Sequence, residues 1–228
     1  MGTEDAPPQR SFSDDAAAAA LAAVTASGPY LPWGAGSLRV GGLVAVLNDV
    51  VLASRRCVLE IGSGTSTVLL ARVLRSRWPQ GGQLQVAVEH NAFWAQWVTD
   101  QLEREGLSAG TTVLHVPLAV HPHALDGRLW YDHERLEAGL DEALGDGQVD
   151  LLLVDGPPAD TVATALSRYP ALPALAARLA AGATVVLDDV ERPGEQEVLD
   201  RWEREQAVVF ERRPDAGVAL GRTTAAAG

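Results

Sequence analysis

Short hydrophobic runs alternate with stretches of helical periodicity along most of this chain. Five runs have the length and apolar character of buried strands, and they lie at 57–61, 83–88, 111–116, 149–154 and 183–187. Apolar residues at helical spacing follow the first run and also mark the segments 38–53, 92–105, 134–144, 161–180 and 194–206. This alternation of strand and helix predicts an α/β fold built on a mostly parallel sheet.

The end of the chain departs from that alternation. Segments 207–212 and 218–222 both have strand character, and the turn residues Pro214-Asp215-Ala216-Gly217 join them. We therefore predict a C-terminal antiparallel hairpin, which brings the sheet to seven strands.

The chain divides into three parts. Residues 1–12 are polar and contain prolines, so we predict a disordered tail. Residues 13–55 are predicted to form two helices, the first capped by Ser13-Asp14-Asp15. The loop between these helices carries Trp33 among glycines, and Trp33 either packs in the ordinary way or belongs to a lid over a ligand. The remaining residues, 56–228, form the sheet domain.

The composition narrows the range of partners. The net charge is −12 and the sequence pI is about 4.8, which disfavours nucleic acid. The single cysteine, Cys57, falls in a predicted core strand, so no disulfide framework is expected and a cytoplasmic setting is favoured. The alanine run 16–20 is too short to span a membrane. A small molecule is therefore the expected partner, and the sequence leaves a homo-oligomer open.

The segment 57–72 carries the most informative local pattern. A strand that contains Glu60 is followed by Gly62-Ser63-Gly64 and then by a helix. Glycines let the backbone turn tightly and approach a ligand, while the helix start presents unpaired N–H groups to the same place. The dinucleotide pattern G-x-G-x-x-G is incomplete, because Thr67 stands at its third glycine. The pattern that fits is acidic-x-Gly-x-Gly, whose carboxylate could pair with a cation.

Carboxylates also stand at the ends of three later strands. Glu89 ends the second strand, 25 residues beyond Gly64, where a carboxylate that binds ribose hydroxyls is expected. The alternative for Glu89 is a carboxylate that faces solvent. Asp155 follows the fourth strand, and Asp188-Asp189 follow the fifth. Because ligands of such sheets bind beyond the carboxyl ends of the strands, we expect these side chains to share one rim with the glycine turn.

Four motifs together resemble class I S-adenosylmethionine (SAM) methyltransferases. They are EIGSG at 60–64, AVEHN at 87–91, VDLLLVDGPP at 149–158 and ATVVLDDVER at 183–192. The similarity runs from about residue 31 to residue 222 and follows the family's order and spacing. It implies a Rossmann-like, doubly wound, mostly parallel seven-stranded sheet, with residues 56–228 as the SAM-binding domain.

The resemblance also implies roles for individual residues. Positions predicted to hold the methionine part of SAM are Glu60, Gly62, Ser63, Gly64 and Ser66, the last standing where the family usually has a third glycine. Glu89 would bind the ribose, with His90 beside it. Asp155 would contact the amino group of SAM, or bind a metal instead.

The acidic residues after the fourth and fifth strands bear on the acceptor chemistry. Asp155, Asp188 and Asp189 resemble the metal ligands of catechol-type and antibiotic-sugar O-methyltransferases, which implies Mg²⁺ as an optional second cofactor. Two departures count against a full match. Asp189 stands where those enzymes carry Asn, and Pro158 stands where they carry a lysine base.

Without a metal, an acceptor hydroxyl needs a general base. His121 and His123, just past the third strand, are candidates together with Asp155, and Asp132 and His133 are further ones. Each histidine could equally be an ordinary surface or turn residue.

The prediction for function is methyl transfer from SAM to a small molecule, at a hydroxyl group, with secondary metabolism as one setting. The alternatives are a metal-independent N- or C-methyltransferase, an aminopropyl transferase, and a non-catalytic partner protein with a SAM-binding fold.

Overall fold

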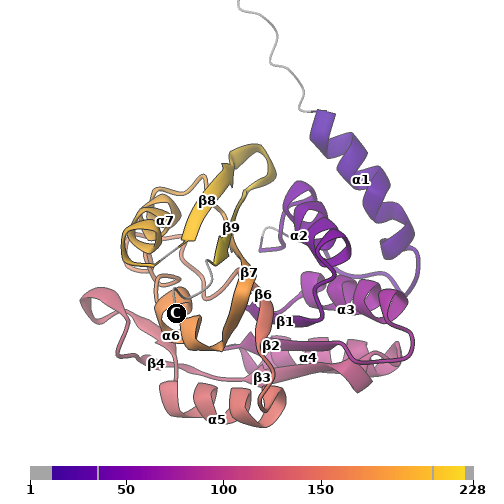
Figure 1. Cartoon of the computed structure of the whole chain (residues 1–228), viewed down its shortest axis with the longest axis horizontal. Helices are drawn as coiled ribbons and strands as arrows, with labels where there is room; N and C mark the ends of the chain where they lie inside the picture. Colours follow the sequence, from indigo (N-terminus) through magenta and orange to yellow (C-terminus); the bar gives the residue numbers. More distant parts are fainter. Residues whose placement is uncertain (1–11, 35, 207, 224–228) are drawn as a thin grey trace, which may run out of the picture.

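The computed structural model describes residues 12–34, 36–206 and 208–223. Seven strands form one sheet in the order β3-β2-β1-β6-β7-β9-β8 (Figure 1). Their bounds are β1 (Cys57–Ile61), β2 (Leu84–Glu89), β3 (Thr111–His115), β6 (Val149–Val154), β7 (Leu179–Asp188), β8 (Val208–Arg213) and β9 (Val218–Thr223). The first five are parallel, while β9 pairs antiparallel with both β7 and β8. The predicted seven-stranded sheet and its hairpin are confirmed.

Helices cover both faces of the sheet. One face carries α1 (Phe12–Thr25), α2 (Val40–Leu52), α3 (Thr65–Arg77) and α4 (Ala92–Arg104), and the other carries α5 (His133–Leu144), α6 (Ala171–Leu175) and α7 (Pro193–Glu205) (Figure 1). Short 3₁₀ turns lie at η1 (Ser108–Gly110), η2 (Leu125–Gly127), η3 (Ala176–Arg178) and η4 (Pro214–Ala216). Two separate apolar cores result, as expected of a doubly wound sheet whose central strands are buried on both sides.

The N-terminal segment is attached to the sheet domain through Arg72 of α3. Its guanidinium donates to the carbonyl oxygens of Val24, Thr25 and Pro29 at 2.9–3.1 Å. Glu105 neutralises that guanidinium with both carboxylate oxygens, at 2.6 and 2.8 Å. The predicted disordered tail lies outside the described residues, apart from the start of α1.

The segment between β3 and α5 forms a small second sheet that the sequence pattern did not predict. It consists of β4 (Leu118–Val120) and β5 (Leu129–Tyr131), which pair antiparallel. Trp130 and Tyr131 are fully buried, so this insert contributes large side chains to the core.

The helix predicted over 161–180 is wrong for most of its length. Turns run to residue 170, α6 has only five residues, and β7 already begins at Leu179. Pro170 and Pro173 explain this, because proline cannot donate a backbone hydrogen bond and disfavours helix in the preceding residue. Leu166 lies at φ +67, which also interrupts a helix.

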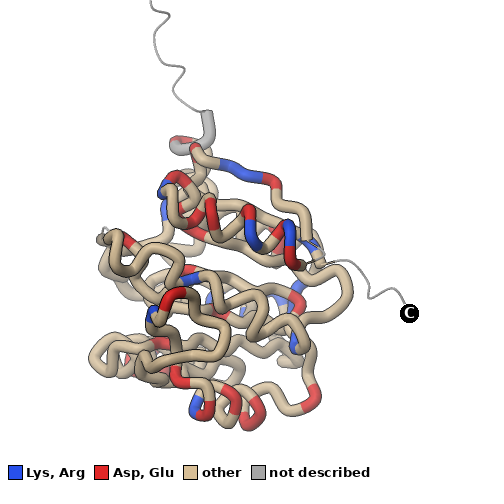
Figure 2. Tube along the Cα trace, turned by 90° about the vertical axis from the view of Figure 1, so that its left-hand side faces the viewer, with Lys and Arg blue, Asp and Glu red and all other residues tan. Residues whose placement is uncertain are grey.

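Charged residues of both signs are interspersed. In the view of Figure 2, the arginine positions of the described chain lie among acidic ones. Within the described ranges, every helix is too short or too polar to cross a membrane.

Candidate cofactor and acceptor site

A cavity of about 200 Å³ opens at the carboxyl ends of β1, β2 and β6. Five of the predicted site residues line it, namely Gly62, Ser63, Glu89, His90 and Asp155. A second cavity, of about 230 Å³, lies between the glycine turn and the loop that joins α1 to α2. The two cavities share Ser63 and Trp94, so they adjoin.

The glycine turn after β1 needs glycine at one position for a steric reason. Gly62 has φ +96, and a Cβ there would lie 3.0 Å from the backbone nitrogen of Gly156. The loops after β1 and β6 therefore touch through Gly62 and Gly156. Gly64 is extended and a Cβ on it would meet nothing within 4 Å, so its requirement does not come from the protein's own packing.

Glu89 is held at the end of β2 by donors on both oxygens. Its Oε2 accepts from the backbone N–H of Ser63 at 3.0 Å and from Ser63 Oγ at 3.2 Å. Its Oε1 accepts from the N–H of Asn91 at 2.8 Å and lies 3.0 Å from His90 Nδ1. Burial by itself would raise the pKa of Glu89, but the hydrogen bonds outweigh it and the pKa is lowered. The carboxylate is therefore ionised and fixed beside the turn.

Glu60 lies behind the glycine turn and does not line either cavity. The side chain is completely buried, and its Oε1 accepts from Ser66 Oγ at 2.5 Å. Burial raises the pKa of Glu60 to about 7 despite this hydrogen bond. Ser66, which stands where a third glycine was expected, thus supplies a partner to a buried carboxyl group. Thr67 supports the same turn, because its Oγ1 accepts from the N–H of Gly64 at 3.0 Å.

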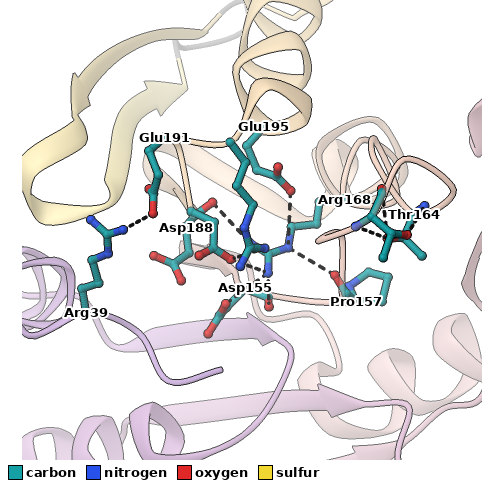
Figure 3. Close-up of polar contacts among 11 residues, drawn as sticks. Arg39, Asp155, Pro157, Thr164, Arg168, Asp188, Glu191 and Glu195 are labelled. Carbon is teal, nitrogen blue, oxygen red and sulfur yellow. Dashed lines mark hydrogen bonds and ion pairs between the residues drawn. The ribbon is translucent and has the colours of Figure 1, made fainter. Parts of the chain in front are cut away.

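Three carboxylates meet where β6 and β7 end, as predicted. One oxygen from each of Asp155, Asp188 and Asp189 lies within 4.8 Å of the others, a spacing that could hold a metal ion. A buried arginine also enters this group. Arg168 Nη2 lies 3.4 Å from Asp155 Oδ1 and 3.0 Å from Asp189 Oδ2, and Figure 3 shows its guanidinium among the acidic side chains.

The electrostatics of this cluster differ from those around Glu89. Burial raises the pKa of Asp155, although Arg168 partly offsets the effect. Burial and the two neighbouring aspartates raise the pKa of Asp188 strongly. Glu195, also completely buried, joins from α7 with a pKa raised to about 7, chiefly by burial.

Known proteins place this arrangement in a family. A family model described as a methyltransferase domain matches residues 59–190, more than half of the chain. The chain is a class I SAM-dependent methyltransferase. No curated protein matches it in sequence.

Solved structures of methyltransferases share the fold. The O-methyltransferase TomG from Streptomyces achromogenes, involved in tomaymycin synthesis and solved with SAM, is 19% identical with a TM-score of 0.54 over 92% of this chain and 90% of that one. An O-methyltransferase from Bacillus cereus, solved with SAH (S-adenosylhomocysteine), is 17% identical with a TM-score of 0.57 over 92% and 91%. The SAH-bound methyltransferase PaMTH1 from Podospora anserina is 13% identical with a TM-score of 0.60 over 99% and 100%.

The candidate base histidines of this methyltransferase do not line the cavity. His121 is buried and packs edge-on against Trp130, with ring centroids 4.7 Å apart. Trp130 and Tyr131 are successive residues of β5, so they point to opposite sides of that strand. Tyr131 lines the cavity, which leaves His121 and its neighbour His123 behind it. Burial lowers the pKa of His121 to about 4.

Aromatic residues at the start of α4 were predicted to lie in the core, and that prediction is wrong. Phe93 is 70% exposed and Trp94 is 40% exposed, and Trp94 lines both cavities. The first turn of α4 extends beyond the sheet edge, where Asn91 caps it by accepting from the N–H groups of Phe93 and Trp94. The core contacts of α4 are made further along, by Val98 and Leu102.

Several cavity residues escaped the sequence analysis. They are Trp94, Tyr131, Arg168 and Arg192. Arg168 was part of a family motif, Arg168-Tyr169-Pro170, but nothing in its neighbourhood indicated a partner, because it contacts residues 13 or more positions away.

Proposed function

We propose that this methyltransferase transfers the methyl group of SAM to a hydroxyl group of a small molecule. The supporting observation is that the glycine turn and an ionised Glu89 line one side of a cavity while Asp155 lines another. The second cavity gives room for an acceptor beside the cofactor, with Trp33 and Trp94 as aromatic walls. Trp33 and its loop would close over the acceptor.

The ribose of SAM would bind to Glu89. A carboxylate has about four lone-pair sites, and all of those on Glu89 already face a donor. A ribose hydroxyl therefore has to displace one donor, and the rotatable Ser63 hydroxyl at 3.2 Å is the easiest to displace. The backbone N–H groups of Ser63 and Asn91 keep the carboxylate in position.

SAM supplies an electrophilic methyl group that needs little further activation. The protein must hold the acceptor oxygen in line with the methyl group and exclude water. As the new carbon–oxygen bond forms and the sulfur–carbon bond breaks, the hydroxyl proton has to leave. Asp155 is our candidate to receive it, because, of the three predicted catalytic residues Asp155, His121 and His123, Asp155 alone lines the cavity.

The carboxylates of Asp155, Asp188 and Asp189 have the chemistry that Mg²⁺ prefers. However, Arg168 already forms ion pairs with two of them. The set does not fit a divalent ion well, and we assign no step of the reaction to a metal.

Hydroxyl methylation is favoured over transfer to nitrogen or carbon because solved structures with the same fold are described as O-methyltransferases. An aminopropyl transferase, which would use decarboxylated SAM, and a non-catalytic partner protein have no supporting contact in the cavity.

Calorimetric titration with SAH tests the cofactor half of this proposal. Wild type should bind, Glu89→Ala should lose most of the affinity, and Glu103→Ala should bind like wild type because that side chain is exposed on α4. Absence of binding to wild type would refute the proposal. Binding of SAM without turnover on panels of hydroxyl-bearing acceptors would favour the non-catalytic alternative.

A further inference from the structure

Arg168 is an unusual residue for the rim of a ligand cavity, because only 3% of its side chain is exposed. We infer that Arg168 is a built-in cation that occupies the acidic cluster at the ends of β6 and β7, so that the cluster is an ion-pair network and not a site for a divalent metal ion. The inference deepens the proposed function, because it decides whether a metal assists the methyl transfer.

The guanidinium is fixed by three backbone carbonyl groups. Nε donates to the oxygen of Pro157 at 3.2 Å, Nη1 to that of Asp188 at 3.2 Å and Nη2 to that of Asp155 at 2.8 Å. These oxygens belong to the loop after β6 and to the end of β7. Arg168 therefore joins the two strand ends, and it cannot rotate out of the cluster without breaking all three hydrogen bonds.

The same guanidinium pairs with the carboxylates around it. Nη2 contacts Asp155 Oδ1 and Asp189 Oδ2, and Nε lies 3.9 Å from Glu195 Oε1. Asp189 Oδ2 has a second cationic partner, because Arg192 Nη1 lies 2.7 Å away. Two of the three candidate metal ligands are thus already committed to arginine.

A metal ion would have to share these oxygens with a fixed positive charge. Mg²⁺ binds oxygen at about 2.1 Å, so an ion on Asp189 Oδ2 would lie no more than about 5.1 Å from Arg168 Nη2, given the 3.0 Å ion pair. In a buried setting two cations at that distance repel strongly. Planar guanidinium and a hydrated divalent ion are alternative ways to neutralise the same carboxylates.

The cluster also indicates where the inference could fail. Among the described residues, Asp188 Oδ1 is buried and has no hydrogen-bond partner. If a cation does bind here, Asp188 is the ligand with a free oxygen, and Asp188→Asn should weaken that binding most.

A consequence follows for the acceptor. A chelated metal favours acceptors with two adjacent hydroxyl groups, because the ion holds both and lowers their pKa. With Arg168 in that place, the cluster offers no such advantage, and an acceptor with a single hydroxyl group is as suitable.

The test is Mn²⁺ binding, measured by electron paramagnetic resonance and by calorimetry on the full-length protein. Wild type should show no binding that depends on the cluster. Arg168→Gln, which removes the charge, should bind Mn²⁺ at least about tenfold more tightly than wild type. Arg192→Gln is the matched control, because it removes the more exposed of the two arginines and leaves Arg168 in place.

Wild-type binding of Mn²⁺ that disappears in Asp188→Asn would overturn the inference. A folded Arg168→Gln protein that gains no affinity would overturn it too, whereas wild-type binding that persists in Asp188→Asn would locate the ion elsewhere and support it. If Arg168→Gln fails to fold, the wild-type and Asp188→Asn proteins still decide the question. This experiment needs neither SAM nor acceptor, so its outcome is independent of the SAH titration.

Discussion

The two halves of the cavity rim neutralise buried carboxylates in different ways. At the ends of β1 and β2, Glu89 is surrounded by backbone and side-chain N–H groups, and its pKa is lowered. At the ends of β6 and β7, Asp188 lies among other carboxylates and its pKa is raised by burial and by those neighbours. Arg168 provides the main compensating charge there.

Residues of the same type at equivalent strand ends therefore have opposite properties. Backbone N–H groups are positioned by the fold itself and remain when a side chain is changed. A guanidinium can be removed by a single substitution, which leaves several acidic groups without compensation. The β1–β2 half should tolerate mutation better than the β6–β7 half, and the following predictions test that difference.

The largest effect is expected from Arg168→Met. Removing one partner of a buried ion pair costs about 3–5 kcal/mol of the free energy of unfolding, and Arg168 also donates to three backbone carbonyls. Urea unfolding measures the loss. Arg201→Met removes a surface pair with Glu197 and should cost less than about 1 kcal/mol. Equal losses in both variants would refute the comparison.

Glu60, under the glycine turn, should give the protein a pH dependence. Because the pKa of Glu60 is raised from 4.5 to about 7 in the folded protein, the folded state holds a proton that the unfolded state releases. Stability from this group is present below pH 4.5, falls as the pH rises to about 7 and is then constant. The whole change is about 3 kcal/mol.

Glu60→Gln cannot titrate and should lack that decrease. The free energies of unfolding of wild type and variant are compared at pH 5 and pH 8, so that other titrating groups cancel. The same fall in both proteins would mean that Glu60 does not titrate in this range. Glu103→Gln, on the surface, should follow wild type.

Glu89→Gln keeps the shape of the side chain but removes its charge. A hydrogen bond to a charged group contributes about 1.5–3 kcal/mol, so SAH affinity should fall by roughly tenfold to a hundredfold. Calorimetry measures it. The fold should remain, because the carboxamide oxygen can still accept one of the two backbone N–H groups. Unchanged affinity would show that Glu89 does not bind the cofactor.

The smallest effect concerns the cap of α4. Asn91→Ala removes the acceptor for two N–H groups and should cost about 1 kcal/mol. Asn48→Ala, at an exposed position within α2, removes no cap and should be neutral or slightly stabilising. A cost of 3 kcal/mol or more for Asn91→Ala, about that of a buried ion pair, would contradict the tolerance expected of the β1–β2 half.

Much of the site was predictable from sequence because parallel strands bring their carboxyl ends to one edge. Gly62, Ser63, Glu89, His90 and Asp155 line the cavity, and Asp155, Asp188 and Asp189 lie together. Each stands at a strand end that the hydrophobic pattern locates to within a residue or two. The functional roles of these residues remain predictions.

Other features depend on contacts that no local pattern encodes. Whether a histidine near a strand end faces the cavity depends on the side of β5 against which it packs, and His121 packs against Trp130 on the side away from the cavity. The sheet β4–β5 comes from strands of three residues, too short to give a clear alternation.

The sequence by itself determined the order of strands and helices, the glycine turn and the row of acidic residues, because periodicity and glycine act over a few neighbouring residues. The tertiary structure alone decided the partner of those acidic residues. Arg168 lies 20 positions before Asp188, in a segment that periodicity assigned to a helix. Prolines and a left-handed residue turned that segment back over the strand ends, and packing then brought the arginine into the cluster.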